Sequence, residues 1–297
     1  MHAELGNPKP LLSIVIATRN RPDNLRRCLE SLRACEVPLG TFAEVLVVDN
    51  GCDEATQALV KSFETGLGQI RFRYLQERRR GKAFAVNSGV RQAIGPILAF
   101  TDDDAIVDKH WPFQIVQEFA RDPALSLLAG RVVARRLDDP ETAVTVVRER
   151  KVLNGALSLE GQVLGCNLAV RPAVLEKVMG RDTRLGPGRG LSCEDIDFAH
   201  RVLRKGFRAV FTPSAFVYHD PGDRDRRREY LRGWGAFYFK FVVTGDSQVA
   251  QQAWWRLRQL LGELARPGRV YGALYQLWQM CVGASIMAQR MLFSRMM

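Results

Sequence analysis

The stretch PILAFTDDDA, residues 96–105, decides the fold, because an apolar run ends there in three adjacent carboxylates. Such a run is typical of a strand covered on both faces of a parallel sheet. Side chains alternate in an extended chain, so we expect Asp102 and Asp104 on one side and Asp103 on the other. Paired carboxylates suit Mg²⁺ or Mn²⁺, which join protein oxygens to phosphates. A solvated acidic turn before a helix is the alternative.

Three strand–loop–helix units precede this stretch. Each has an apolar run, a polar loop and a segment with helical apolar spacing; the runs are residues 11–17, 44–50 and 70–75, and the helical segments are 22–32, 55–63 and 83–93. This alternation predicts an α/β fold with a Rossmann-like, mixed but mainly parallel sheet flanked by helices. In such sheets ligands bind at the carboxyl ends of the strands.

Polar residues gather at the predicted strand ends. Thr18 to Asn20, Asp49 and the Asp102–Asp104 triplet all occupy such positions, which indicates a nucleotide site. Neither a GxGxxG fingerprint after the first strand nor a P-loop motif is present, so the phosphates need another partner. The run RRRGK, residues 78–82, lies just before a helix and supplies cations for a diphosphate. A solvated basic loop is the alternative.

The second half of the catalytic region has weaker patterns. Further strands are expected at residues 125–133, 163–170, 208–211 and 215–218, with a helix at 172–178 and no readable pattern over 137–160. The glycine-rich segment 186–190 precedes a helix with Glu194, Asp195 and Asp197 in its first turn. Residues two apart do not share a helix face, so Asp195 and Asp197 should not enter one site. These acids either cap the helix or include a general base.

His219 ends the last expected strand, where a structural hydrogen bond and a ligand role are equally compatible with its position. No secretory signal opens the chain, so we expect a cytoplasmic protein. We expect a catalytic domain at residues 1–220 and a basic, aromatic-rich helical region at 221–297, which holds 12 Lys and Arg against 5 Asp and Glu.

The C-terminal region carries four of the five tryptophans and is a poor transmembrane span. Basic and aromatic amphipathic helices suit peripheral binding to the inner membrane face. Packing on the catalytic domain or a homo-oligomer interface is the other interpretation. The region lacks a nucleic-acid motif, so nucleic acid is not an expected partner.

Seven segments, taken in order, resemble the family 2 inverting glycosyltransferases of the GT-A fold. They are SIVIATRNRPDNLRRCLESL (13–32), VLVVDNGCDEAT (45–56), RRRGKAFAVNSG (78–89), LAFTDDDA (98–105), GCNLAVRPAVL (165–175), SCEDIDFAHRVLRKGFR (192–208) and VYH (217–219). The resemblance implies an enzyme that moves a sugar from a nucleotide diphosphate, with UDP as the default, to a hydroxyl of a saccharide, lipid-linked or other small acceptor.

The resemblance also implies roles for single residues. Nucleotide binding is implied for Thr18, Arg19, Asn20, Asp49, Arg80, Lys82, Asp102 and Asp103. Asp104 would bind a divalent metal, manganese or magnesium, with His219 as a further ligand. Asp195 would be the catalytic base, and Glu194 would help position the acceptor.

Two departures from the family pattern, Cys166 and Cys193, bear on acceptor fit. Two other functions stay open: a sugar-nucleotide nucleotidyltransferase and a non-catalytic sugar-nucleotide-binding protein. The first would need a glycine-rich phosphate loop near the amino terminus, and residues 18–23 contain no glycine.

Overall fold

The computed structural model describes residues 9–64, 68–134, 144–145, 147–156, 159–220 and 227–296. The expected boundary between residues 220 and 221 adjoins residues outside these ranges. Much of the segment 137–160 also lies outside them.

The first half of the chain alternates strands and helices as the sequence predicts. The elements are β1 (Leu12–Thr18), α1 (Pro22–Arg33), β2 (Ala43–Asp49), α2 (Glu54–Glu64), β3 (Ile70–Gln76), α3 (Lys82–Gln92) and β4 (Leu98–Asp102). Helix α1 begins with a proline, whose fixed φ and missing N–H suit a first helical position. Its buried residues Leu25, Cys28, Leu29 and Leu32 recur at helical spacing, which explains why this segment forms a helix against the sheet.

The second half completes the sheet and adds the C-terminal helices. Its elements are β5 (Ala105–Val107), α4 (Trp111–Arg121), β6 (Leu125–Ala134), β7 (Lys151–Val152), β8 (Leu168–Val170), α5 (Pro172–Val178), α6 (Glu194–Arg204), β9 (Arg208–His219), α7 (Arg227–Val242), α8 (Ser247–Leu264) and α9 (Val270–Met296). None of the helices within the described ranges has the length and apolar character needed to cross a membrane.

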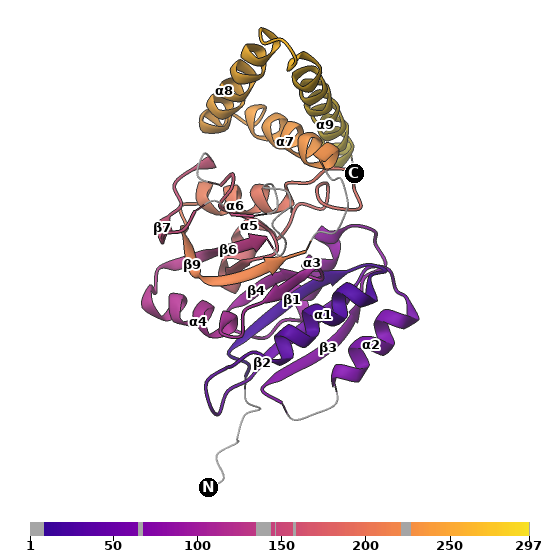
Figure 1. The fold of residues 1–297 in the computed structure, drawn as a ribbon, viewed down its shortest axis with the longest axis vertical. Helices are drawn as coiled ribbons and strands as arrows, with labels where there is room; N and C mark the ends of the chain where they lie inside the picture. Colours follow the sequence, from indigo (N-terminus) through magenta and orange to yellow (C-terminus); the bar gives the residue numbers. More distant parts are fainter. Residues whose placement is uncertain are drawn as a thin grey trace.

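The strands form one mixed sheet in the order β3-β2-β1-β4-β8-β6-β9-β5, with β7 paired to β9 (Figure 1). The four strands β3, β2, β1 and β4 run parallel to one another. In the β1–β4 pair, Ala17 lies opposite Asp102. Strand β8 is antiparallel to both β4 and β6. The parallel block brings the carboxyl ends of β1, β2 and β4 to one edge, which places Thr18, Asp49 and Asp102 beside one another.

Two apolar layers cover the sheet. Buried residues of α1, α2 and α4 pack on one face against Ile14 and Ile16. On the other face α3, α5, α6 and α7 pack around Val15 and Phe100. The alternation of Ile14, Val15 and Ile16 between the layers explains the continuous apolar run, because both faces are buried.

Helices α7, α8 and α9 gather beyond the sheet, at the end of the molecule away from β3 and α2 (Figure 1). Helices α7 and α9 pack backbone to backbone. A Cβ added at Gly235 would lie 1.9 Å from the carbonyl oxygen of Met280, and one added at Gly283 would lie 1.9 Å from that of Arg232. Glycine is required at both positions because any side chain would clash.

One strand prediction was wrong in part, and two predicted strands are a single strand. Residues 163–167 form turns and only Leu168–Val170 is a strand, because the chain bends at Gly165 toward helix α6. The runs 208–211 and 215–218 belong to one strand, β9, which continues through an irregularity in its pairing with β6. That continuity carries His219 to the same edge as Asp104, whose carbonyl accepts the Asp220 backbone N–H at 2.9 Å.

Candidate active site

Asp102, Asp104 and His219 form a cluster whose potential ligand atoms lie within 4.8 Å of one another. Asp102 ends β4, Asp104 lies in the turn before β5, and His219 ends β9. Asp104 Oδ1 is buried and makes no hydrogen bond, and His219 Nε2 lies 3.4 Å away. Two carboxylates and an imidazole are a donor set that Mn²⁺ accepts, and the unbonded oxygen is positioned to bind a cation, so the residues fit such an ion.

Asp103 points away from this cluster, as the sequence predicts. Its side chain is fully buried, where Oδ2 accepts a hydrogen bond from the Thr18 hydroxyl at 2.7 Å and Oδ1 pairs with Arg21. Arg21 also reaches Asp104 Oδ2 at 2.8 Å. Asp103 therefore holds Thr18 and Arg21, and its own contact with a nucleotide stays a prediction.

Arg21 is a site residue that the sequence patterns did not single out. It follows β1 in the loop that also holds Arg19, and its charge opposite the acidic triplet was the available signal. Burial raises the pKa of Asp103, and the neighbouring Asp104 adds to the rise. Burial also acts to raise the pKa of Asp104, but His219 and Arg21 outweigh it and lower that pKa.

Lys82 joins the acidic edge to the start of helix α6. Its Nζ lies 2.6 Å from Asp102 Oδ1 and 3.7 Å from Glu194 Oε1. Burial acts to lower the pKa of Lys82, but the Asp102 and Glu194 carboxylates outweigh it and raise the pKa. Burial raises the pKa of Glu194, which Lys82 partly offsets. The lysine therefore keeps its positive charge between these two carboxylates.

The basic loop is held by Asn50, which follows β2. Its side-chain Nδ2 donates to the carbonyls of Glu77 at 2.6 Å and Arg79 at 2.8 Å, and its Oδ1 accepts the Gly81 N–H at 2.8 Å. Gly81 has φ +138°, a conformation that glycine adopts without strain. These contacts fix the path of the loop, while the Arg80 side chain stays exposed beside it.

Asp195 occupies the first turn of α6 and is only partly buried. Its Oδ2 accepts the backbone N–H of Gly165 at 2.7 Å, and its Oδ1 accepts that of Ile196 at 2.9 Å. Glu194, beside it, is buried and faces Lys82. Asp195 is thus an oriented carboxylate next to the acidic cluster, a geometry suited to accepting a proton.

Asp197 takes no part in this site, as the helical spacing predicts. Its fully buried carboxylate bonds Arg201 Nε at 2.7 Å and pairs with Lys240 of α7. Lys240 Nζ also lies 2.7 Å from Asp182 Oδ2. This ion-pair network anchors α6, and with it Asp195, to helix α7.

The expected base pocket lies at the ends of β1 and β2. Asp49 is fully buried, and its carboxylate accepts the N–H groups of Gly51, Cys52 and Asp53 at 2.8, 2.9 and 3.0 Å. Arg19 and Asn20 are exposed next to it. The carboxylate of Asp49 orders its own loop here, so its contact with a base or ribose stays a prediction.

The glycine-rich segment 186–190 lies against the basic loop and Glu194. The Pro187 carbonyl accepts the Lys82 N–H at 3.1 Å. From α9, Arg290 Nη2 donates to the Arg189 carbonyl at 2.8 Å, and Arg290 Nη1 bonds the Arg184 carbonyl at 2.5 Å. Helix α9 therefore holds the segment that contacts Lys82.

Arg181 is a second residue that sequence reasoning missed. It is 5% exposed and lies over the rings of Phe198 and Phe100, at 4.6 and 5.2 Å from their centroids. Its Nε has no hydrogen-bond partner, and burial lowers its pKa. A small cavity between Arg181, Lys82, Asp102 and Glu194 lies beneath the site. No motif marks this arginine in the sequence.

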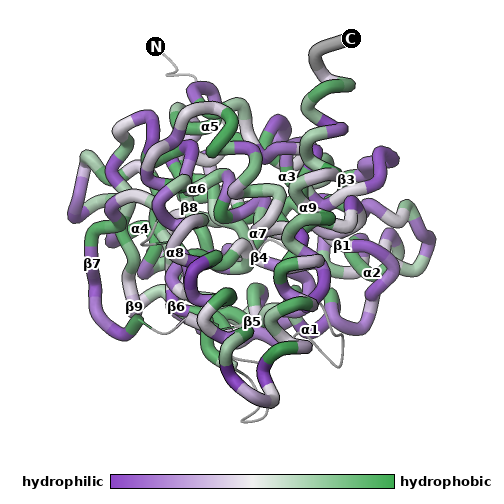
Figure 2. The backbone as a smooth tube through the Cα atoms, turned by 90° about the horizontal axis from the view of Figure 1, so that it is seen from above, coloured by the Kyte–Doolittle hydropathy of each residue, from purple (hydrophilic) through white to green (hydrophobic). Residues whose placement is uncertain are grey.

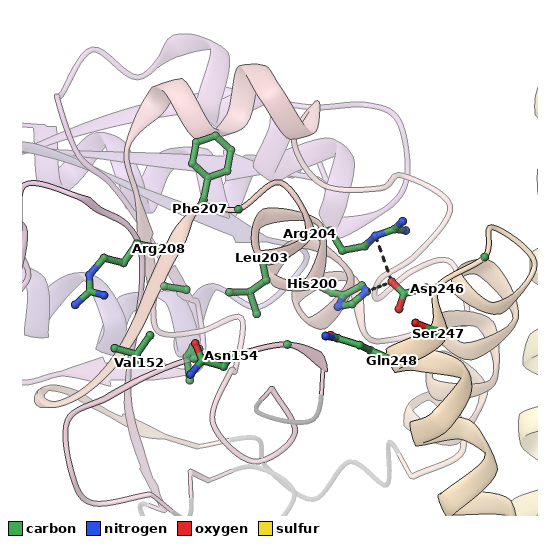
Figure 3. Close-up of a pocket in the computed structure, with 15 residues that line it drawn as sticks. Val152, Asn154, His200, Leu203, Arg204, Phe207, Arg208, Asp246, Ser247 and Gln248 are labelled. Atoms are coloured by element: carbon green, nitrogen blue, oxygen red, sulfur yellow. Dashed lines mark hydrogen bonds and ion pairs between the residues drawn. The ribbon is translucent and has the colours of Figure 1, made fainter.

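A larger cavity, of about 720 Å³, lies elsewhere (Figure 3). It is bounded by the second half of α6, the start of β9 and the turn before α8, and His200 and Arg204 contact Asp246 there at 2.8 and 3.3 Å. Asp246 Oδ1 also caps α8 by accepting the Val249 N–H at 3.0 Å. The cavity contains none of the predicted site residues.

Comparison with known proteins identifies the family. The sequence model described as "Glycosyl transferase family 2" matches residues 13–170, which include the acidic triplet and the basic loop. Glycosyltransferase AglE of Haloferax volcanii is 25% identical over 82% of this chain and 74% of its own length. The pre-mycofactocin glycosyltransferase of Mycobacterium tuberculosis is 27% identical over 80% of this chain, and the match spans 49% of that protein.

Solved structures support the fold. The mannosyltransferase PcManGT from Pyrobaculum calidifontis, in complex with GDP-Man and Mn²⁺, is 20% identical with a TM-score of 0.65, covering 96% of this chain and 81% of its own. TarS of S. aureus, in complex with UDP-GlcNAc, is 17% identical with a TM-score of 0.60, covering 78% of this chain and 65% of its own. The C-terminal helices are thus included in the match to PcManGT.

Proposed function

The chain belongs to glycosyl transferase family 2, an inverting family of glycosyltransferases, and we propose that it uses a metal-dependent reaction to transfer a sugar from a UDP-sugar to an acceptor hydroxyl. The observation that carries the proposal is the position of Asp195. Its carboxylate is oriented and partly exposed, and it lies in the same first helix turn as Glu194. Glu194 lies near Lys82, which in turn contacts Asp102 of the acidic cluster.

In this proposal Asp195 takes the proton of the acceptor hydroxyl. The hydroxyl oxygen bonds to the anomeric carbon while the bond from that carbon to the diphosphate oxygen breaks, and the diphosphate leaves with the electron pair. Attack from the side opposite the leaving group inverts the anomeric centre. Glu194 and the segment 186–190 position the acceptor, which is a saccharide or a lipid-linked molecule.

The leaving diphosphate needs positive charge, and the site offers it. Arg21, from the loop after β1, and Lys82, from the basic loop, pair with the acidic triplet, and Arg80 is exposed in the same basic loop as Lys82. Such charges stabilise a developing anion because they are already oriented before the reaction. Asp102, Asp104 and His219 would hold a manganese or magnesium ion, which supplies further charge neutralisation when bound.

The donor base is the open part of this proposal. TarS was solved with UDP-GlcNAc and PcManGT with GDP-Man, so the two structural relatives differ in their donors. We take UDP as the base, with the donor bound against Thr18, Arg19 and Asp49. GDP is the alternative that the experiments compare.

The stereochemistry of the product tests the reaction type. The protein is incubated with UDP-GlcNAc or GDP-mannose, a Mn²⁺ salt and a panel of saccharide acceptors, and the anomeric configuration of the product is read by NMR. We expect the product to have the opposite configuration to the donor. A product that retains the donor configuration would contradict a single displacement with Asp195 as base.

A further inference from the structure

Helices α8 and α9 form a hairpin at the far end of the molecule (Figures 1 and 2). Large apolar side chains are exposed on both helices. On α9, Tyr271, Leu274, Tyr275 and Trp278 are 89, 50, 38 and 60% exposed. Their spacing of three, four and seven residues places them on one helix face. A face of this composition, uncovered in the described structure, is unusual for a protein surrounded only by water.

Helix α8 adds a matching face. Trp254, Leu257 and Leu261 are 62, 37 and 49% exposed and also recur at helical spacing. The two helices touch where Arg256 Nη2 donates to Gln276 Oε1 at 3.3 Å.

The two faces lie on one side of the hairpin. Leu260 of α8 and Ala273 of α9 are buried. Each residue of a helix is rotated by about 100° from the one before it. In an antiparallel pair, the residue after a contact position on one helix therefore points to the same side of the pair as the residue after a contact position on the other. Leu261 and Leu274 occupy these positions. We call Trp254, Leu257, Leu261, Tyr271, Leu274 and Trp278 the hairpin patch.

The charge around the hairpin patch is mainly positive. Residues 247–297 contain six arginines, no lysine, one glutamate and no aspartate, a net charge of +5. Arg258, Arg266 and Arg269 are exposed on or between the two helices. Arginine interspersed with tryptophan, tyrosine and leucine is the composition of helices that lie in a membrane interface.

We propose that the hairpin patch docks onto the surface of a lipid bilayer that contains anionic headgroups. Leucine and tryptophan side chains enter the boundary between headgroups and acyl chains, and the arginines bind the anionic headgroups. The helices lie on the bilayer, since none of those described could span it.

A second copy of this chain is the competing occupant, and the charge argues against it. A two-fold dimer would place the same arginine-rich surface on both sides of its interface. Glu263 is the single acid in this segment, and it already lies 3.8 Å from Arg269. The arginines of two such copies would repel each other, whereas the anionic headgroups of a bilayer attract them.

Docking would also tether the proposed active site to the bilayer through α9, a consequence that rests on the proposed function. Arg290, on the same helix as Trp278, bonds the carbonyls of Arg184 and Arg189, just before and within the glycine-rich segment 186–190. The vesicle experiment below needs no catalysis, so its failure and the failure of the proposed reaction are distinguishable.

Flotation with vesicles tests the proposal. The full-length protein is mixed with vesicles of phosphatidylcholine alone or of phosphatidylcholine with phosphatidylglycerol. We expect it to float with the mixed vesicles and to be released by high salt, because salt screens charge attraction. The Asp195→Asn variant should float equally well. Protein that stays in solution with the mixed vesicles would overturn the proposal.

Paired variants localise the effect. Trp254→Ala with Trp278→Ala should weaken binding by about tenfold or more. Arg258→Gln with Arg266→Gln should weaken it to a similar extent, since each arginine near an anionic surface contributes a factor of about five. The matched controls are Leu39→Ala with Ile94→Ala and Lys61→Gln with Lys177→Gln, which remove equally exposed residues elsewhere.

Two results would contradict the assignment. One is unchanged flotation of both patch variants, provided that their circular dichroism matches that of the wild type. The other is a dimer by light scattering that becomes a monomer in the tryptophan variant, which would identify the hairpin patch as a subunit interface.

Discussion

Asp195 Oδ2 accepts the backbone N–H of Gly165 at 2.7 Å, which ties the first turn of α6 to the bend before β8. The bonds described for this carboxylate come from backbone N–H groups, which orient it without adding a positive charge. A catalytic base must be held in position and must stay accessible to the acceptor. The contact with Gly165 holds Asp195 in position, and its partial exposure keeps it accessible.

Asp195→Asn should therefore stop turnover and spare the fold. The amide cannot accept the acceptor proton, so we expect kcat to fall by about 10² to 10⁴. Nucleotide affinity should stay within about twofold of the wild type, because Asp195 is proposed to act on the acceptor. Initial rates of nucleotide release and calorimetric titration measure the two effects. A variant that keeps its kcat would show that another group is the base.

Lys240→Met should act on stability instead. Lys240 neutralises the buried carboxylates of Asp197 and Asp182, and its removal leaves both without that charge. Breaking such a buried pair costs about 3–5 kcal/mol of unfolding free energy. Lys205→Met, at an exposed position, is the control and should change little. Denaturation by urea checks this; equal stability of the two variants would contradict the structural role.

The same network predicts acid sensitivity. Burial acts to raise the pKa of Asp182, but Arg184 and Lys240 outweigh it and lower the pKa. A lowered pKa in the folded state adds stability above the ordinary aspartate value of about 3.9, and this is lost as the pH falls through the folded value. The unfolding free energy should fall below about pH 4 more steeply in the wild type than in Asp182→Asn. Exposed Asp23→Asn should follow the wild type.

Gly81→Ala should disturb the basic loop. An alanine at this position would have to adopt φ +138°, and its Cβ would lie 3.3 Å from two side-chain carbons of Arg189. We expect a loss of about 1–3 kcal/mol of stability and weaker nucleotide binding. Gly262→Ala, inside α8 with no atom within 4 Å of the new carbon, should be neutral or slightly stabilising. Thermal unfolding and nucleotide titration separate the two variants.

Local patterns predicted the part of the fold in which each segment has a clear period. The strands before Thr18, Asp49 and Asp102 are continuous apolar runs because both sheet faces are covered, and α1 shows its buried face in the spacing of Leu25, Cys28, Leu29 and Leu32. The bend at Gly165 was missed because an apolar run such as VLGCNLAV has the composition of a strand.

Tertiary contacts account for the site residues that were missed. Arg21 contacts Asp103 and Asp104, which lie 82 and 83 residues further along the chain. Arg181 is buried against Phe100 and Phe198, partners that no local pattern links to it. Lys240 meets Asp182 and Asp197 across a helix packing interface. Such pairings depend on the assembled fold, whereas strand and helix periods are local.

Calorimetric titration of the protein with UDP and with GDP, each with and without Mn²⁺, tests the central claim most directly. We expect UDP to bind tightly only with Mn²⁺, and Asp104→Ala to remove the metal dependence and most of the affinity. The control Glu30→Ala, which removes an exposed carboxylate from α1, should bind like the wild type. Tight binding of GDP alone would change the donor but keep the site. Binding of neither nucleotide, or binding by Asp104→Ala with unchanged metal dependence, would contradict a metal-assisted nucleotide-sugar site at this edge of the sheet.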